Sequence, residues 1–454
     1  MADLLDGLPA RAVVTDLDRL ESYRRDEAHL CDAGTPAVLV LAQDTAQVQH
    51  VMRCATRHGV PVVPQGARSG LSGAANAVDG CIVLSLERMD AILAVEAPDR
   101  YAVVQPGVVN AALAAAAAAA GLSYPPDPSS RGWSTLGGNI ATNAGGLCCV
   151  KYGVTADFVL GLEVVLADGS LLRTGRRTAK GVAGYDLTRL FVGSEGTLGV
   201  ITEATLALRP AAGAARTLAA VFPTTVSAGA AVAAITAAGC LPSLLEVIDG
   251  TTLRAIEDLT PLGTPPDAAV LLLAQCDTGD RAQADLAEIG VLCAASGATD
   301  VLEATDAAES ALLLEARRLA YPALERLGVA MVEDVAVPRS RLSAFLDGVE
   351  QVARRTGLVI GVVGHAGDGN MHPTVVFPRG DAEAAAVAEA AFDEIMQLGL
   401  DLGGTITGEH GVGLLKRAWL EREVGPVSMR VQHGLKDLLD PHGLLNPGKV
   451  LRSR

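Results

Sequence analysis

The chain has 454 residues, half of them hydrophobic, and a formal net charge of −16. This composition excludes a disordered or fibrous protein, and at roughly 150 residues per domain it suggests two or three domains with large cores. Basic residues form no block longer than an adjacent pair, so we expect no nucleic acid partner.

The eight cysteines are scattered through apolar segments without a CxxC pair, which indicates reduced core residues and no iron–sulfur centre. The first residues lack a basic region followed by an apolar run, so we expect a cytoplasmic protein, with peripheral attachment to the inner face of the membrane as the alternative. The alanine-rich run over residues 111–122 falls well short of the roughly 20 residues that a membrane-spanning helix needs.

The first part of the chain alternates between strand and helix patterns. Strands are predicted over residues 37–42 and 60–64 around a helix at 44–58, followed by strands at 81–86 and 101–105. Gly121 ends the alanine-rich helix. Strands over 159–167 and 171–174 are joined at Asp168-Gly169, which predicts a hairpin.

Small residues and proline near 208–215 indicate a linker to a second alternating region. There the pattern predicts strands at 218–222, 244–247, 268–274, 330–337 and 358–363, and helices at 225–238, 282–296, 307–327 and 340–356, with a last helix at 427–439. This order resembles split β-α-β units and favours a ferredoxin-like domain.

Three segments are rich in glycine and small polar residues: 64–73, directly after a strand, then 135–146 and 193–202. Their backbone N–H groups can approach an anion closely, and Ser69 and Ser72 add donors suited to a diphosphate. None has the GxGxxG context of a nicotinamide-binding unit, so a dehydrogenase with dissociable NAD is disfavoured.

His365 and His372 flank Gly367-Asp368-Gly369, which can turn sharply enough to bring two imidazoles together. With a carboxylate from Glu409 they make a three-ligand set for which zinc, manganese or iron(II) is chemically reasonable. The spacing alone is equally compatible with histidines that only form hydrogen bonds in a turn.

Taken together and in this order, the glycine-rich segments resemble the FAD domain of the vanillyl-alcohol oxidase and p-cresol methylhydroxylase (PCMH) superfamily. Specifically, they resemble the branch that contains D-lactate dehydrogenases, D-2-hydroxyglutarate dehydrogenases and the FAD subunit of glycolate oxidase. The resemblance covers nearly the whole chain and implies an α+β fold. Its parts are a two-part FAD-binding domain of the PCMH type (1–210), a ferredoxin-like α+β cap domain (211–425), and a C-terminal helical segment that returns to the flavin domain (426–454).

The resemblance also implies the FAD contacts. The first loop would hold the diphosphate through Pro64, Gly66, Ala67, Arg68, Ser69, Gly70, Leu71 and Ser72. The flavin channel would be lined by Pro106, Gly107, Ser134, Thr135, Gly138, Asn139, Thr142 and Gly145. The adenosine side would be bordered by Gly193, Glu195, Gly196 and Val200, and the tail would add Asn446. Because residues 61–80 contain no histidine or cysteine, we expect FAD to be bound non-covalently.

In the 2-hydroxyglutarate-type relatives, HxGDGNxH and GEHG motifs supply the metal ligands, which correspond here to His365, His372 and Glu409; zinc or manganese is then favoured. His410 is the candidate base for the substrate hydroxyl, with support of the metal site as its alternative role, and Asn370 could orient the hydroxyl or carboxylate.

Arg317 corresponds to the family arginine that binds the substrate carboxylate, with Arg318 as the rival because Leu314 replaces the tryptophan that often precedes it. The threonine and lysine that bind a distal carboxylate correspond to Tyr321 and Val332, which argues for a smaller, D-lactate-like acid. Lys449 either approaches the flavin or is a surface lysine.

The resulting hypothesis is an FAD-dependent dehydrogenase of a small 2-hydroxy acid that passes electrons to a quinone, a cytochrome or an electron-transfer flavoprotein, with a homodimer as a fair expectation. An alternative is the catalytic subunit of a glycolate-oxidase-like complex. A non-redox FAD transferase ranks low because the chain lacks consecutive histidines, and the intact motifs argue against a flavin-binding protein without catalysis.

Overall fold

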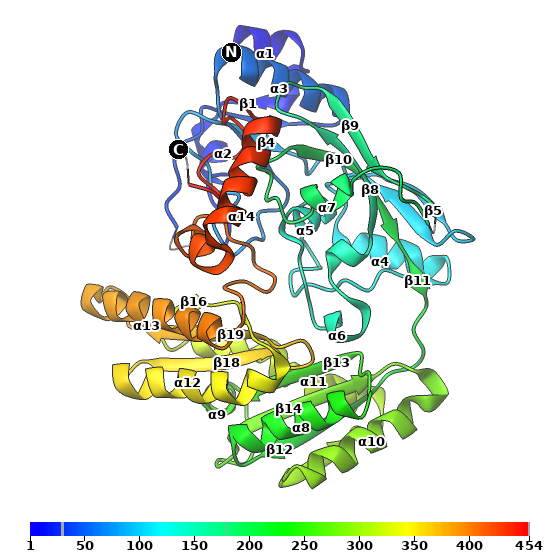
Figure 1. Ribbon diagram of the computed structural model, residues 1–454, viewed down its shortest axis with the longest axis vertical. Coiled ribbons are helices and arrows are strands. Elements are labelled where there is room, and N and C mark those ends of the chain that lie inside the picture. The colour runs from blue at the N-terminus through cyan, green and yellow to red at the C-terminus, as the bar shows by residue number, and fades with distance from the viewer. Residues whose placement is uncertain (29–30, 179, 453–454) are drawn as a thin grey trace. The chain divides into compact units, whose positions relative to one another are not determined.

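The computed structural model describes residues 1–28, 31–178 and 180–452, and these fall into two units (Figure 1). Unit 1 comprises Met1–Gly145, Gly153–Ala211 and Glu409–Arg454, and unit 2 comprises Gly146–Tyr152 and Ala212–Gly408. The chain therefore leaves unit 1 and returns to it twice.

The first sheet of unit 1 has the order β1-β2-β4-β3, with bounds Val13–Val14, Val38–Leu41, Ile82–Ser85 and Val62–Gln65. β2 and β3 both run parallel to β4. Helix α3 (Thr45–His58) joins β2 to β3; it begins where the Asp44 carboxylate accepts from the Gln47 N–H and ends at Gly59. The expected β-α-β opening is confirmed, and the apolar strands are buried because helix and sheet cover them.

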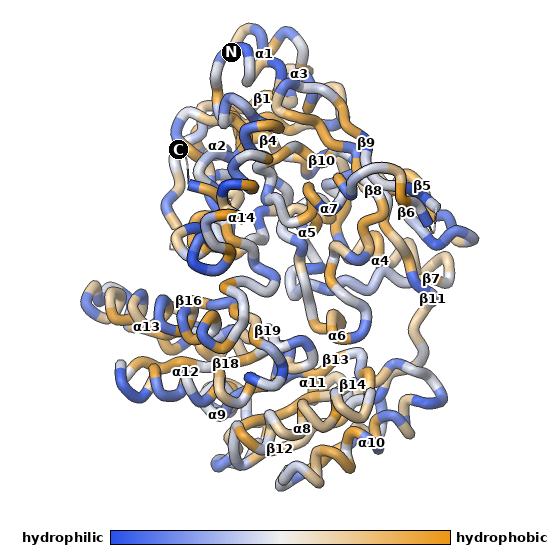
Figure 2. The backbone as a smooth tube through the Cα atoms, in the orientation of Figure 1, coloured by the Kyte–Doolittle hydropathy of each residue, from blue (hydrophilic) through white to orange (hydrophobic). Residues whose placement is uncertain are grey.

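The second sheet of unit 1 is antiparallel, with the order β5-β6-β10-β8-β9. Its strands span Ile92–Glu96, Tyr101–Val104, Val200–Ala207, Val159–Val165 and Leu171–Gly175. The predicted hairpin at Asp168-Gly169 is confirmed by the pairing of β8 with β9. Two sheets in one unit agree with the expected two-part FAD-binding domain, and Figure 2 shows the apolar strands β8 and β10 inside it.

The remaining helices and strands complete unit 1. They are the helices α1 (Ala2–Asp6), α2 (Leu17–Glu21), α4 (Asn110–Ala119), α5 (Leu136–Thr142), α7 (Leu187–Phe191) and α14 (Arg417–Leu439), the strands β7 (Leu122–Ser123) and β11 (Arg209–Pro210), and two 3-10 turns at Ala10–Ala12 and Thr155–Asp157. The last helix begins at Arg417, earlier than predicted, and Gly425 interrupts it with a φ of 75° before Pro426. The sequence pattern predicted only the part after this break.

Unit 2 is built on one antiparallel sheet with the order β15-β12-β14-β13-β18-β19-β16, and β17 pairs with β19. Its strands are β12 (Arg216–Phe222), β13 (Leu244–Asp249), β14 (Val270–Cys276), β15 (Asp300–Glu303), β16 (Val329–Val332), β17 (Val335–Ala336), β18 (Val359–His365) and β19 (Asn370–Phe377). In chain order the first four strands are arranged 4-1-3-2, which is the ferredoxin-like arrangement, and β16, β18 and β19 repeat its first three positions. The expected ferredoxin-like cap is confirmed.

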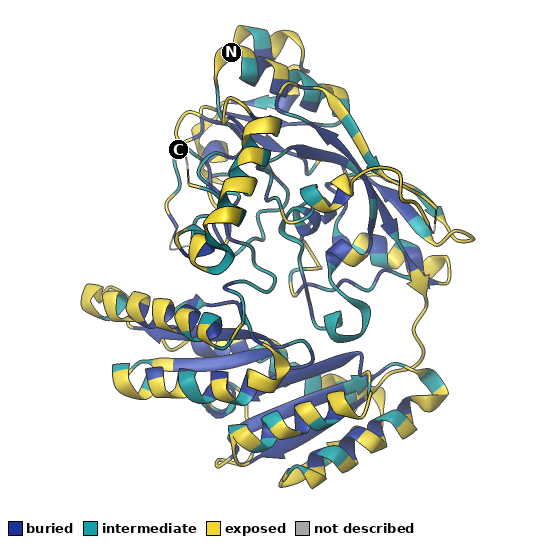
Figure 3. Cartoon of the chain, in the orientation of Figure 1, coloured by how far each residue is buried: buried dark blue, intermediate teal, exposed yellow. Residues whose placement is uncertain are grey.

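The helices of unit 2 are α6 (Cys149–Tyr152), α8 (Thr225–Ala237), α9 (Gly250–Leu259), α10 (Ala282–Ala295), α11 (Ala307–Glu325), α12 (Leu342–Thr356) and α13 (Ala382–Asp401), with 3-10 turns at Gly279–Arg281 and Arg339–Arg341. In Figure 3 the central strands β12, β13, β14 and β18 are buried, whereas α8, α10, α12 and α13 each expose one side. α9 and α11 pack against each other. No helix among the described residues is long and apolar enough to span a membrane.

One strand prediction is wrong in detail. Residues 330–337 do not form a single strand, because Glu333 and Asp334 separate β16 from β17. Both side chains are fully buried. A carboxylate pair buried at a break in a strand costs free energy unless it is hydrogen-bonded or compensated, so this break points to a site.

Candidate functional site

Two imidazoles lie together at the end of the β18–β19 hairpin. The register pairs His365 with Asn370 and Val363 with His372, and the two imidazole centroids are 5.2 Å apart with ring planes at 83°. Gly369 closes the turn with a φ of +86°, and a Cβ there would lie 2.1 Å from the carbonyl oxygen of Val337. The glycine therefore permits the sharp turn that the sequence predicts.

Buried carboxylates surround these histidines. Glu246 on β13 is fully buried, and its Oε1 lies 2.6 Å from His365 Nδ1. Asp334 Oδ1 lies 3.8 Å from His372 Nδ1, and Asp334 Oδ2 accepts a hydrogen bond of 2.7 Å from the Thr407 hydroxyl. Charged groups are buried at this depth when they are paired or bind a cation. The donor set of two imidazoles amid carboxylates fits a divalent metal.

Sequence reasoning did not identify Glu246 or Asp334. The signal that could have found them is a carboxylate inside an otherwise apolar strand segment, Leu244-Leu-Glu-Val-Ile for the first. Their partners could not be found this way, because each contact depends on strand pairing between distant parts of the chain.

The two candidate arginines on α11 differ in environment. Arg317 Nε donates to Glu246 Oε2 at 2.8 Å, and its side chain is one-fifth exposed. Arg318 pairs with Glu315 on an exposed face of the helix. Only Arg317 therefore belongs to the cluster around His365.

The GEHG motif begins beside this cluster. A Cβ on Gly408 would lie 2.4 Å from the carboxamide of Asn370, so the chain passes directly over that side chain. Glu409 and His410 follow by one and two peptide bonds, and consecutive Cα atoms are about 3.8 Å apart. Within unit 1, a Cβ on Gly145 would lie 2.4 Å from Glu409 Oε2. The Glu409 carboxylate therefore lies against the segment assigned to the flavin channel.

The segments assigned to FAD converge within unit 1. Cβ atoms on Gly66, Gly137 and Gly196 would lie 2.2 Å from Thr135 Oγ1, 2.5 Å from Pro106 Cβ and 2.6 Å from Pro64 Cγ, respectively. Glycine is needed at these points because the backbone of one loop packs directly against a side chain of the next. All four cofactor segments, 64–73, 106–107, 134–145 and 193–200, therefore meet around one region.

This region holds buried polar atoms suited to a polar ligand. In the described part of the chain, hydrogen-bond partners are missing for the buried atoms Ser72 Oγ, Ser134 Oγ, Thr135 Oγ1, Asn139 Nδ2 and Asn446 Oδ1. Every one of these residues is on the list of FAD contacts that the resemblance implies. Unpaired buried polar atoms are costly, and a bound cofactor with many acceptors and donors satisfies them. The residues present fit FAD.

Backbone strain marks the same segments. Arg68, Glu195 and Asn446 have positive φ values of 63°, 52° and 42°. A non-glycine residue with a positive φ costs about 1–3 kcal/mol of folding free energy. Such residues persist where the surrounding structure holds them in place, often at functional sites.

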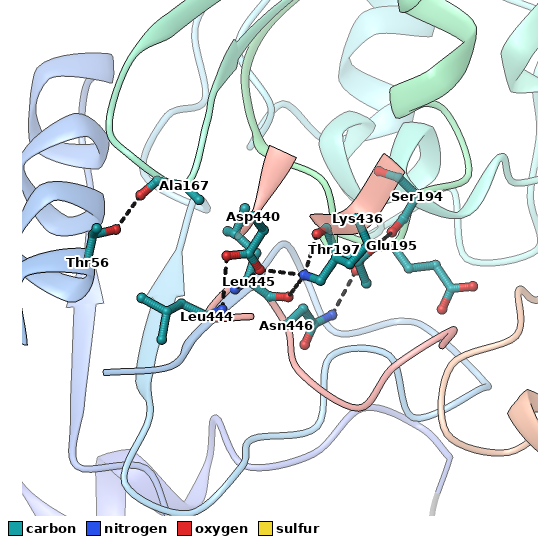
Figure 4. A network of polar contacts seen from close by, with 10 residues as sticks. All are labelled: Thr56, Ala167, Ser194, Glu195, Thr197, Lys436, Asp440, Leu444, Leu445 and Asn446. Carbon is teal, nitrogen blue, oxygen red and sulfur yellow. Dashed lines mark hydrogen bonds and ion pairs between the residues drawn. The ribbon is translucent and has the colours of Figure 1, made fainter. Parts of the chain in front are cut away.

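The C-terminal tail closes unit 1 around the third glycine-rich segment (Figure 4). Asn446 Nδ2 donates to the carbonyls of Ala74 and Glu195 at 2.8 and 2.7 Å, and Lys436 Nζ donates to the carbonyls of Thr197 and Leu445. Lys449 is buried and donates to the carbonyl of Asn76, so the surface-lysine alternative is wrong. Burial lowers the pKa of Lys449 to about 8.

Glu195 connects the cofactor segments to the GEHG motif. Its carboxylate accepts the N–H groups of Val412 and Gly413 at 2.7 and 2.8 Å. Burial raises its pKa to about 7, although these two hydrogen bonds act in the opposite direction. The side chain that the resemblance assigns to the adenosine side thus fixes the backbone just after His410.

Comparison with known proteins identifies both parts of the chain. Residues 36–175 match an FAD binding domain, and residues 212–450 match the C-terminal domain of FAD linked oxidases. The glycolate oxidase subunit GlcD of Bacillus subtilis (strain 168) is 42% identical over 91% of this chain and 89% of its own length. The D-lactate dehydrogenase of Anaerostipes hadrus is 33% identical over 97% of this chain and 95% of its own length.

Solved structures show the same fold at low sequence identity. A p-cresol methylhydroxylase crystal structure with substrate bound matches with a TM-score of 0.81 at 17% identity over 99% of this chain and 96% of its own. An alkyldihydroxyacetonephosphate synthase matches with a TM-score of 0.79 at 18% identity over 98% of this chain and 84% of its own.

Proposed function

The chain belongs to the family of FAD linked oxidases, and from this premise we propose that it oxidises a small 2-hydroxy acid, of the size of lactate or glycolate, to the 2-oxo acid. The observation that carries the proposal is the buried cluster of His365, His372, Glu246 and Arg317, which joins a metal-type donor set to a carboxylate-binding arginine. When bound, FAD accepts the hydride from C2 of the hydroxy acid.

We propose that His365, His372 and Glu409 hold a divalent metal, zinc or manganese, which would lower the pKa of the substrate hydroxyl. These three side chains are among the groups of the chain that could hold a metal ion. The two imidazoles and one carboxylate leave positions open for the substrate.

The remaining roles follow from chemistry and position. His410 takes the hydroxyl proton, because a neutral imidazole is a base of suitable strength near neutral pH. Arg317 binds the substrate carboxylate, and Asn370, which lies under Gly408, orients the substrate. Non-covalent FAD contacts come from the four converging segments and Asn446.

The substrate is proposed to be a monocarboxylate. Tyr321 follows Arg317 by one helical turn on α11, and Val332 on β16 pairs with Thr374, two residues from His372. Neither side chain offers a cation for a second carboxylate. Relatives named D-lactate dehydrogenase and glycolate oxidase subunit support this size class.

The electron acceptor is proposed to be a quinone, a cytochrome or an electron-transfer flavoprotein. The similarity to a protein named as a glycolate oxidase subunit favours a second candidate, a catalytic subunit that needs partner subunits. Comparing turnover of the isolated chain with turnover in the presence of its co-purifying proteins separates the two. A cytoplasmic location and a homodimeric state remain expectations for this protein.

The test is anaerobic reduction of the FAD- and zinc-loaded protein by D-lactate, L-lactate, glycolate and D-2-hydroxyglutarate, each added separately. We expect D-lactate or glycolate to bleach the visible flavin band and D-2-hydroxyglutarate to react far more slowly. A His410→Gln variant should keep FAD but lose reduction by roughly 100- to 10,000-fold. Bound FAD that none of the four acids reduces would contradict the proposed substrate class, and a protein that binds no FAD would contradict the proposal as a whole.

A further inference from the structure

We propose that Glu246 is a positioning residue that holds the metal ligand His365 and the substrate-binding Arg317 as one hydrogen-bonded unit. The inference rests on the proposed function and adds to it a residue through which metal binding and substrate binding depend on each other. Glu246, His365 and Arg317 all belong to unit 2.

The position of Glu246 is set by the sheet. β13 pairs with β18 in a register that places Glu246 opposite His365, and α11 lies against this part of the sheet with Arg317 directed at the same carboxylate. Glu246 is 0% exposed. A carboxylate at this depth is retained because both of its oxygens have charged or polar partners.

Each oxygen of Glu246 has its own partner. Oε1 lies 2.6 Å from His365 Nδ1, and Oε2 accepts from Arg317 Nε at 2.8 Å. A carboxylate only accepts, so His365 must carry its proton on Nδ1. In the neutral imidazole, Nε2 then keeps a lone pair for a metal, in the arrangement by which carboxylates commonly fix metal-binding histidines.

The same contact orients the arginine. With Nε bound to Glu246, the two terminal nitrogens of Arg317 remain for a forked interaction with a carboxylate. Because Arg317 is one-fifth exposed while Glu246 is fully buried, the guanidinium separates the buried carboxylate from the side that a substrate can reach. Loss of the Glu246 charge should therefore disturb both the metal and the substrate carboxylate.

Asp334 supplies a matched comparison. It is also fully buried; its Oδ1 lies 3.8 Å from Nδ1 of the other histidine, His372, and its Oδ2 accepts from the neutral hydroxyl of Thr407. Asp334→Asn should weaken the metal site alone. Glu246→Gln should weaken both metal binding and substrate binding. Its amide oxygen can accept from only one of the two partners, His365 or Arg317, and its NH₂ group, which is itself a donor, then faces the donor of the other partner.

The experiment compares the FAD-loaded wild type, Glu246→Gln and Asp334→Asn in two measurements, with FAD content and melting temperature checked for each. Zinc affinity is measured by chelator competition without substrate, and KM is measured at saturating zinc with the acid that reduces the wild type. We expect both variants to lose about 10- to 100-fold in zinc affinity. Of the two variants, only Glu246→Gln should also raise KM, by roughly 10-fold or more, in the direction that we expect for Arg317→Ala.

The outcomes separate the inference from the function on which it rests. If the wild type binds zinc and is reduced by a hydroxy acid, but Glu246→Gln keeps its zinc affinity or changes KM no more than Asp334→Asn, the inference is wrong and the proposed function stands. If the wild type binds no zinc and no acid reduces it, the proposed function fails and the inference fails with it. If Glu246→Gln is unfolded, Glu246→Asp, which keeps the charge on a shorter arm, replaces it and should show the same pair of losses in smaller measure.

Discussion

Single carboxylates determine much of the site, and burial places the pKa of one of them, Glu195, near neutral pH. Its pKa is raised from 4.5 to about 7 because the side chain is buried, while Val412 and Gly413 donate to it. A carboxyl whose pKa is higher in the folded than in the unfolded state favours folding most when it is protonated. Its contribution is therefore fully present below pH 4.5 and is lost as pH rises through about 7.

Glu195→Gln should flatten this dependence. The amide cannot ionise, so the variant should not lose the roughly 3 kcal/mol that the shift implies for the wild type between these pH values. Melting temperatures of the two FAD-loaded proteins, measured from pH 5 to pH 8, test this. The exposed Glu421→Gln is the control and should run parallel to the wild type; a parallel curve for Glu195→Gln as well would contradict the assignment.

The adjacent residues Arg317 and Arg318 allow a second test, of which arginine binds the substrate carboxylate. Arg317 joins the buried cluster, whereas Arg318 pairs with Glu315 in solvent. Arg317→Ala should raise KM for the hydroxy acid by about 100-fold, because charge-assisted contacts contribute about 1.5–3 kcal/mol each. Arg318→Ala should leave KM within about 2-fold, since exposed ion pairs contribute little. Steady-state kinetics decide between them, and equal effects would remove Arg317 from its proposed role.

The residues named from sequence and those found only in the structure differ in a physical way. His365 and His372 could be predicted because one short turn brings them together, so local sequence contains the information. Glu246 could not, because it meets His365 across 119 residues through the register of β13 and β18. Orphaned polar atoms such as Ser134 Oγ likewise become visible only once the loops have converged.

Among the secondary structure elements, the β18–β19 hairpin matters most because it sets the distance between the two histidines. Gly369 lies in its turn and Gly380 lies three residues beyond the end of β19, and both have positive φ values, +86° and +81°. The two glycines differ in the room available for a side chain. A Cβ at Gly369 would lie 2.1 Å from the Val337 carbonyl oxygen, whereas a Cβ at Gly380 would have no atom within 4 Å.

Gly369→Ala should therefore distort the turn and lower zinc affinity by at least about 10-fold together with the melting temperature. Gly380→Ala should cost only the roughly 1 kcal/mol of backbone strain and leave zinc affinity unchanged. Calorimetry and chelator competition on both variants measure the two effects. Unchanged zinc binding in Gly369→Ala would show that the turn does not fix the ligand spacing.

The same distinction explains which elements the sequence predicted. Regular alternation identified β2, α3, β8 and β9, because period and turn chemistry are local properties. The sequence pattern predicts one strand over residues 330–337, because the apolar and β-branched residues of this segment outweigh its two carboxylates. The break at Glu333 and Asp334 arises from a tertiary demand, their burial beside His372, which no local pattern expresses.

For the whole molecule, the two units contribute different parts of the proposed site. The segments assigned to FAD lie in unit 1 together with Glu409 and His410, whereas His365, His372, Glu246 and Arg317 lie in unit 2. Each unit has its own sheets and buried residues, so loss of a bound group from one unit need not unfold the other.

Composition predicts a linker near residues 208–215, and the boundary between the two units lies within it, after Ala211. The early excursion of residues 146–152 into unit 2 could not be predicted, because it depends on Lys151 and Tyr152 both contacting Asp277.

This division predicts that metal and flavin can be removed independently. His365→Ala combined with His372→Ala should abolish metal binding and flavin reduction, yet leave about one FAD per chain, because none of the proposed FAD contacts is altered. Chelation of the wild type should have the same effect and be reversed by zinc or manganese. Metal analysis and the flavin absorption spectrum of the same samples make the measurement. Loss of FAD together with the metal would mean that the flavin depends on the hairpin of unit 2, and full activity without metal would show that Arg317, Asn370 and His410 suffice for the reaction.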